Sequence, residues 1–113
     1  MVEFALVLPL VLVVMVAVVE VALVARAQLE VSHAAREGAR EAAASPEPGR
    51  AVAAVQASLG GDAAARARVS VSRDHRVGGR AEVTVSLPYR VAAPLFGGME
   101  VRLEGRAVMR VER

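Results

Sequence analysis

An uninterrupted apolar run near the start of the chain constrains the fold more than any other feature. The run covers residues 4–25 and reads FALVLPLVLVVMVAVVEVALVA, in which Glu20 is the one ionisable residue. As a helix, roughly 22 residues are about 33 Å long, close to the thickness of the hydrocarbon core of a bilayer. A small soluble domain cannot easily bury a helix that is apolar on every face. The sequence therefore predicts a membrane-spanning helix, and we assign residues 1–25 to this segment.

A cleaved secretory signal peptide is the main alternative for such a run. A signal peptide has a basic segment before a shorter apolar run, and a small-residue cleavage site before a polar mature chain. No basic residue precedes the run here, and the Ala-Arg-Ala-Gln that follows its last leucine and valine favours continued helix. The sequence therefore favours a membrane-spanning helix that is kept.

The residues after the apolar run predict that the same helix continues outside the membrane over residues 26–45. Between Arg26 and Ala44 there is no proline and a single glycine, and Ser-Pro-Glu-Pro-Gly then ends the helix. Small apolar residues recur there at three- and four-residue steps. This predicted helix-packing face comprises Ala27, Val31, Ala34, Ala35, Gly38 and Ala42. A face of small residues lets another backbone approach closely, either the chain's own following domain or a neighbouring helix in an assembly.

Residues 46–113 change in composition and predict a small domain. Val52, Val55 and Leu59 lie on one face of a short amphipathic helix, which Gly60-Gly61 ends. Three stretches then alternate apolar and polar residues, which predicts an antiparallel sheet of about three strands. The expected fold class is α+β: a long N-terminal transmembrane helix that extends into a domain with a short helix and this sheet.

Glycines and one apolar loop refine that prediction. Gly78-Gly79 lies between the first two alternating stretches and predicts a hairpin turn, and Gly105 is a candidate β-bulge in the third. Residues 88–98 are expected to form a loop. Its larger side chains, Tyr89, Leu95 and Phe96, either fill the core or contact a partner.

Two carboxylates are candidates for charge pairing during assembly. Glu3 precedes the apolar run by one residue, so it is either a favourable charge at a helix N-terminus or a charge inside the membrane that a partner neutralises. Glu20 lies near the far end of the run, where it either sits among headgroups or meets an arginine of a partner.

The rest of the composition offers no chemistry. The chain has no cysteine, two histidines and a net charge of +2, so no thiolate metal site and no nucleic-acid-binding patch are indicated. Neither histidine has a second ligand at metal-binding spacing, and no nucleophile or phosphate-loop motif is present. We expect no enzyme activity, cofactor, metal, nucleic acid or small-molecule substrate.

Several short blocks of the chain nevertheless resemble one family. Val-Glu-Phe-Ala-Leu-Val-Leu-Pro at residues 2–9, the late carboxylate in the span and Ala-Ala-Arg-Glu-Gly-Ala-Arg at residues 34–40 are similar to the TadE-like family. Leu-Pro-Tyr-Arg at residues 87–90, Pro-Leu-Phe-Gly-Gly at 94–98 and Ala-Val-Met-Arg-Val-Glu at 107–112 fit the same family more loosely.

The resemblance implies a pseudopilin or minor pilin of the tight-adherence (Flp-type) pilus system. Its partners would be the membrane, other pilin-like subunits, the pilus assembly machinery and a prepilin peptidase that cuts just ahead of the apolar helix. By analogy with type IV pilins, Glu3 would pair with the N-terminal amine of a neighbouring subunit or position the helix in assembly. The family's basic leader does not precede Glu3 here, so the start was assigned late, the leader was trimmed, or this member is not processed.

The orientation in the cell membrane is predicted differently by two arguments. Arg26, Arg36 and Arg40 follow the span, which by the positive-inside rule places the domain in the cytoplasm. The resemblance implies an extracytoplasmic domain, and we adopt that prediction. The alternative function is a membrane-tethered binding module, unrelated to pili, that captures a partner with the loop between Tyr89 and Phe96.

Overall fold

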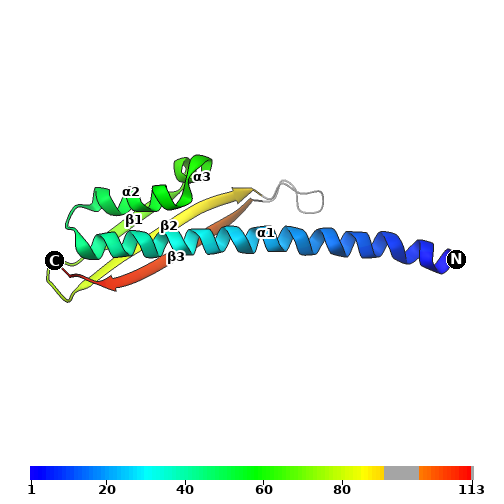
Figure 1. The fold of residues 1–113 in the computed structure, drawn as a ribbon, viewed down its shortest axis with the longest axis horizontal. Helices are drawn as coiled ribbons and strands as arrows, with labels where there is room; N and C mark the ends of the chain where they lie inside the picture. The colour runs from blue at the N-terminus through cyan, green and yellow to red at the C-terminus, as the bar shows by residue number, and fades with distance from the viewer. Residues whose placement is uncertain (91–99, 113) are drawn as a thin grey trace.

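The computed structural model describes residues 1–90 and 100–112. One long helix, α1 (Val2–Ala44), forms the axis of an elongated molecule of 71 × 24 × 17 Å (Figure 1). A small domain packs along its C-terminal half and consists of the elements α2 (Pro48–Leu59), α3 (Gly61–Arg66), β1 (Arg68–Arg73), β2 (Arg80–Arg90) and β3 (Glu100–Arg110). The predicted α+β fold is confirmed. The single turn and a half of α3 was not predicted.

The long helix ends at Ala44, just before the Ser45-Pro46 dipeptide. The backbone N–H of Ser45 donates the last helical hydrogen bond to Glu41 O, and Pro46 after it has no N–H to continue the ladder. Pro48 then occupies the first turn of α2, where a missing N–H costs nothing. Gly60 ends α2 with a φ of +67°, a left-handed conformation that glycine adopts without strain.

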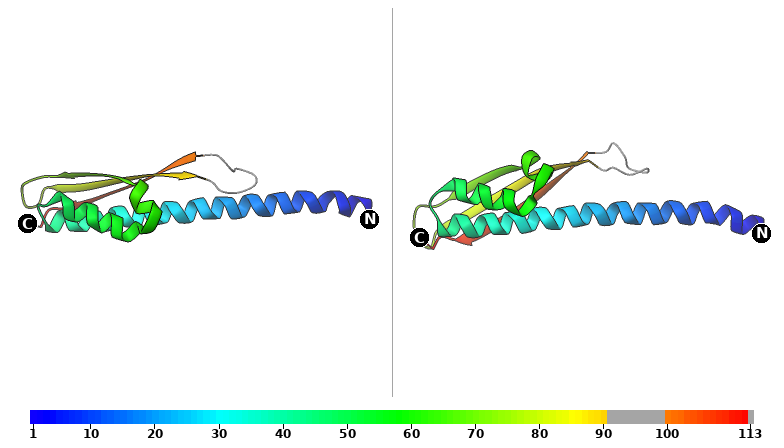
Figure 2. Two further views of the ribbon diagram at one scale, coloured as in Figure 1. Left: turned by 90° about the horizontal axis from the view of Figure 1, so that it is seen from above. Right: turned by 45° about the horizontal axis from the view of Figure 1, so that its top comes forward.

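The three strands form one antiparallel sheet in the order β1-β2-β3. The sheet is one layer of the domain, and α1 and α2 lie together on one of its faces (Figure 2). Every second residue of β2 points into the space between the layers, and Ala81, Val83, Val85 and Leu87 are buried there. The opposite face of the sheet is polar and borders solvent.

The core is unusually rich in small side chains at the place where three elements meet. A Cβ atom added at Gly38 would lie 2.5 Å from Val55 Cγ2 of α2 and 3.0 Å from Val83 Cγ1 of β2. Both distances are below ordinary van der Waals contact, so a side chain here would push either α2 or the sheet away from α1. Glycine and alanine on α1 therefore set the spacing between the layers.

The predicted bulge at Gly105 is wrong. The pairing of β2 with β3 runs without interruption from Arg80 opposite Arg110 to Arg90 opposite Glu100, and it includes Val85 opposite Gly105. The glycine serves a close approach instead, because a Cβ at this position would lie 2.8 Å from the carbonyl oxygen of Val31 in α1. A glycine within a strand marks either feature, and the sequence does not distinguish them.

The predicted loop also begins too early. Pro88, Tyr89 and Arg90 belong to β2 and pair with β3. At the level of Pro88, β2 has a strand partner on one side only, because β1 begins opposite Ser86. A proline is compatible with a strand in such an edge position. Leu95 and Phe96 lie outside the described residues.

The close approach at Gly105 generates a stability prediction. Gly105→Ala should destabilise the domain by about 1–3 kcal/mol, because the new methyl group meets backbone atoms of α1 that cannot rotate away. Guanidinium unfolding of the detergent-solubilised protein, followed by circular dichroism, measures this change. Gly49→Ala is the matched control, since a Cβ there meets no atom within 4 Å. Equal stability of the two variants would contradict the close approach.

Candidate functional site: two halves of the long helix

The two halves of α1 differ in what covers them. Residues 2–15 of the helix are exposed around its whole circumference, although nearly all of them are apolar. Among the described residues, α1 is the one helix long and apolar enough to cross a membrane. This half is therefore suited to lipid or to other apolar helices, and the arrangement is that of a single-pass membrane anchor.

The predicted helix-packing face lies against the chain's own domain. Its residues Val31, Ala34, Ala35 and Ala42 are at most 1% exposed, and Gly38 contacts α2 and β2 as described above. Ala27 is half-buried against the same core. The sequence left open whether the chain's own domain or a neighbouring helix covers this face. In the structure the domain covers it, so a neighbouring helix would have to pack on a different face of α1.

Glu3 lies in the first turn of α1 and is exposed. A charge of this kind at a helix N-terminus is favourable by itself, but its position at the start of an apolar segment places it beside hydrocarbon once the helix spans a bilayer. Within the described part of the chain Glu3 forms no salt bridge, so its role in charge pairing stays a prediction.

Glu20 has a different environment from Glu3. It is 2% exposed, whereas the adjacent Val19 and Val21 are 57% and 62% exposed. Glu20 precedes Val24 and Ala27 by four and seven residues, so it lies on the face of α1 that carries the domain. The structure thus turns Glu20 toward its own chain, and a pairing of Glu20 with another subunit stays untested.

The domain also overlaps the end of the predicted span. Val24 packs against the domain core, and Glu20 is buried one turn earlier. The opposite side of the helix remains apolar and exposed as far as Leu23. The turn of α1 from Glu20 to Leu23 therefore has the domain on one side and exposed apolar side chains, suited to lipid, on the other.

Three hydrogen bonds tie the domain to α1 at separate points along the helix. Gln28 Nε2 donates to the carbonyl oxygen of Glu104 at 2.7 Å, and Arg73 Nε donates to the carbonyl oxygen of Ala42 at 2.7 Å. The backbone N–H of Glu112 donates to Ala43 O at 2.8 Å. They hold the domain parallel to the anchor. Only the folded chain brings these partners together, so sequence patterns do not reveal them.

Two further polar side chains of the domain, Tyr89 and His75, lie at opposite ends of the sheet. Tyr89 is half-buried in β2 and packs against the core. His75 lines a cavity of about 200 Å³ at the distal end of the domain, together with Arg73 and Ser45. Within residues 1–90 and 100–112, no three His, Asp or Glu side chains gather closely enough to hold a metal ion.

Comparison with known proteins gives one match. Residues 1–40 match the model of the family described as TadE-like protein, which confirms the resemblance inferred from the sequence. The matched stretch ends within α1 and includes both of its characteristic blocks, while the domain motifs lie beyond it. No curated protein and no solved structure matches the chain. The match covers the first 40 of the 113 residues, and at the family level it supports an association with the tight-adherence pilus.

The bond from Gln28 gives a test of how the domain is held. Gln28→Ala should lower the free energy of unfolding by about 0.5–1.5 kcal/mol, because it removes the hydrogen bond that the carbonyl oxygen of Glu104 in β3 accepts from this side chain. Chemical unfolding in detergent measures the loss. Gln56→Ala, an exposed glutamine of α2, changes the same side chain and should have little effect. If Gln28→Ala is as stable as Gln56→Ala, the bond does not hold the domain.

Proposed function

We propose that this TadE-like chain is a membrane-anchored pseudopilin or minor pilin, a structural component in the assembly of a tight-adherence (Flp-type) pilus. The family match over residues 1–40 carries the proposal, because it covers the helical half that the domain leaves exposed. The proposed role is structural rather than enzymatic. Its partners are the membrane, other pilin-like subunits and the assembly machinery, with a prepilin peptidase acting on the precursor.

The dimensions of α1 support this role. Residues 2–19 lie beyond the domain, and as a helix these roughly 18 residues span about 27 Å, close to the thickness of a hydrocarbon core. Apart from Glu3 their side chains are all apolar, and most of them are branched or small, so they can pack against lipid or against a neighbouring helix. One segment can thus anchor the subunit and later pack in a bundle.

The free-energy cost of placing the Glu3 carboxylate in hydrocarbon supports the same role. A carboxylate carried into hydrocarbon loses its hydration, and an insertion penalty of a few kcal/mol is typical for an ionisable residue there. A cationic group of a neighbouring subunit, such as an N-terminal amine, offsets that penalty. In the proposed mechanism Glu3 therefore favours the assembled state over the isolated subunit.

The domain is proposed to lie outside the cytoplasm, as the family resemblance implies. Its fixed position beside α1 would present the polar face of the sheet to subunits or machinery on that side of the membrane. A membrane-tethered binding module unrelated to pili is the alternative. Its candidate contact residues Leu95 and Phe96 lie outside the described residues, so no observation favours it.

The role of Glu3 is testable by crosslinking. In cells with the tight-adherence machinery, Glu3→Gln should reduce photo-crosslinking of the apolar helix to other pilin-like subunits about tenfold or more, because the neutral side chain cannot attract a cation. Glu30→Gln is the matched control, since its carboxylate pairs with Arg26 on the exposed surface. Wild-type crosslinking by Glu3→Gln would leave Glu3 as a helix-terminal charge only.

The orientation is testable by labelling. The chain contains no cysteine, so Ser72→Cys on the exposed face of β1 introduces one unique thiol. If the domain is extracytoplasmic, a membrane-impermeant maleimide labels this thiol in intact spheroplasts. Labelling only after lysis would place the domain in the cytoplasm, as the arginines after the span suggest.

A further inference from the structure

One end of the sheet lies at the level where α1 changes from apolar to charged. β3 runs in the same direction as α1, as the contacts of Glu104 with Gln28 and of Glu112 with Ala43 show (Figure 1). Glu100 begins β3 four residues before Glu104, which is about 13 Å of strand or about nine residues of helix. The start of β3 and the end of β2 therefore lie close to the level of Glu20, beside the last turns of the apolar half.

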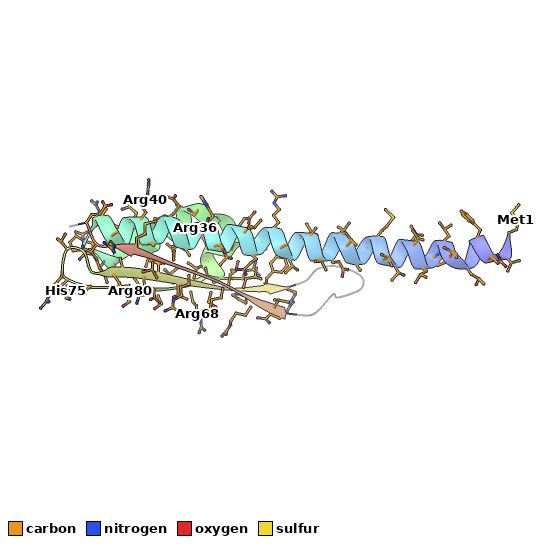
Figure 3. All side chains as sticks on the ribbon, turned by 90° about the horizontal axis from the view of Figure 1, so that it is seen from below. Met1, Arg36, Arg40, Arg68, His75 and Arg80 are labelled. Carbon is orange, nitrogen blue, oxygen red and sulfur yellow. The ribbon has the colours of Figure 1, made fainter. Side chains whose placement is uncertain are left out.

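Arginines gather at this membrane-proximal end of the domain. Arg90 ends β2, Arg102 follows the start of β3, and Arg66 and Arg68 flank the start of β1. All four are exposed. In β1, β2 and β3, the positions of Arg68, Arg90 and Arg102 belong to the face of the sheet turned away from the helices. Figure 3 shows Arg68 projecting from that face.

Two of these arginines share a notch. Arg66 and Arg90 line an open cavity of about 270 Å³ together with Pro88 and Glu100. Guanidinium groups bind phosphate oxygens through paired N–H donors, and two of them around one concave site favour a phosphate group. The apolar ring of Pro88 offers no competing donor. The notch thus has two cationic side chains against the single carboxylate of Glu100, and it lies beside the end of the apolar half of α1.

The charge balance at this end is positive. Asp62, Glu100 and Glu104 are the acidic residues near this end, against four arginines, and the segment 91–99 carries no charged residue in the sequence. Farther along the sheet the charges pair within the face, as Arg106 does with Glu82 at 2.6 Å. The positive patch therefore lies at the end of the domain nearest the apolar half of α1, where a bilayer around that half would offer lipid phosphates as the nearest anions.

We propose that the membrane-proximal arginines, with the notch between Arg66 and Arg90 at their centre, bind the headgroup of an anionic phospholipid in the bilayer that α1 spans. Arginine near a lipid surface keeps its charged end among headgroups while its carbon chain lies on apolar surface. Binding of a headgroup fixes the height and the tilt of the domain above the membrane. This inference requires membrane anchoring by α1 but no role in a pilus.

Lipid titration of the full-length protein tests the proposal. In detergent micelles, native mass spectrometry would measure the affinity for dioleoyl phosphatidylglycerol and for dioleoyl phosphatidylcholine. We expect the anionic lipid to bind at least about tenfold more tightly, since each arginine near the surface adds to the attraction. Arg66→Gln/Arg90→Gln should remove that preference.

The matched control is Arg76→Gln/Arg80→Gln, which removes two exposed arginines at the distal end of the same sheet. It should keep the lipid preference, and circular dichroism should show the same fold for both variants. Equal affinity of the wild type for the two lipids, or equal loss in both double variants, overturns the proposal. Inorganic phosphate that competes at the affinity of phosphatidylglycerol would identify a site for soluble anions and would also overturn it.

Discussion

The close contact of α1 with the sheet and with α2 is the constraint on which the rest of the structure depends. At Gly38, the side chains of Val55 and Val83 occupy the place where a Cβ would be, and at Gly105 the strand approaches the backbone of α1 to the same degree. These contacts leave no room for a larger side chain, so the distance between the helices and the sheet depends on glycine at these two positions. Alanines on the rest of the stripe extend the contact along the helix.

One helix consequently serves two environments. Its first half has apolar side chains in every direction and suits a phase without water, while its second half has one narrow apolar stripe for a thin domain. Because α1 continues through both, any tilt of the anchor is passed to the domain. The hydrogen bonds from Gln28, Arg73 and Glu112 prevent the domain from swinging away from this axis.

Charged side chains lie at the level where the exposed apolar half of α1 ends and the domain begins. Glu20 is turned toward the domain, whereas exposed apolar side chains continue to Leu23 on the other side of α1. At the same level, the end of the sheet presents Arg90 beside the notch that Arg66 also lines. Assembly, anchoring and lipid contact would therefore involve separate parts of the chain: Glu3 and the exposed half-helix, the whole span, and the membrane-proximal arginines.

The sequence by itself determined the elements that follow from local patterns. The apolar run and the alanine-rich stretch predict α1 as one helix, and the proline–glutamate–proline segment predicts its end. The alternation of apolar with polar residues predicts three strands, the first two of them joined by the Gly78-Gly79 turn. The family blocks at residues 2–9 and 34–40 are likewise visible in the sequence, because each is a contiguous run of residues that needs no tertiary contact to be recognised.

Only the tertiary structure decided the features that depend on distant neighbours. It shows which partner covers the small-residue stripe, why Gly105 is a close approach rather than a bulge, and why Pro88 is tolerated where β1 has not yet begun. It also brings Arg66 and Arg90 to the same notch, although 23 residues lie between them in the sequence. The physical reason is the same in each case: a local pattern specifies a residue's own conformation, while packing specifies what faces it.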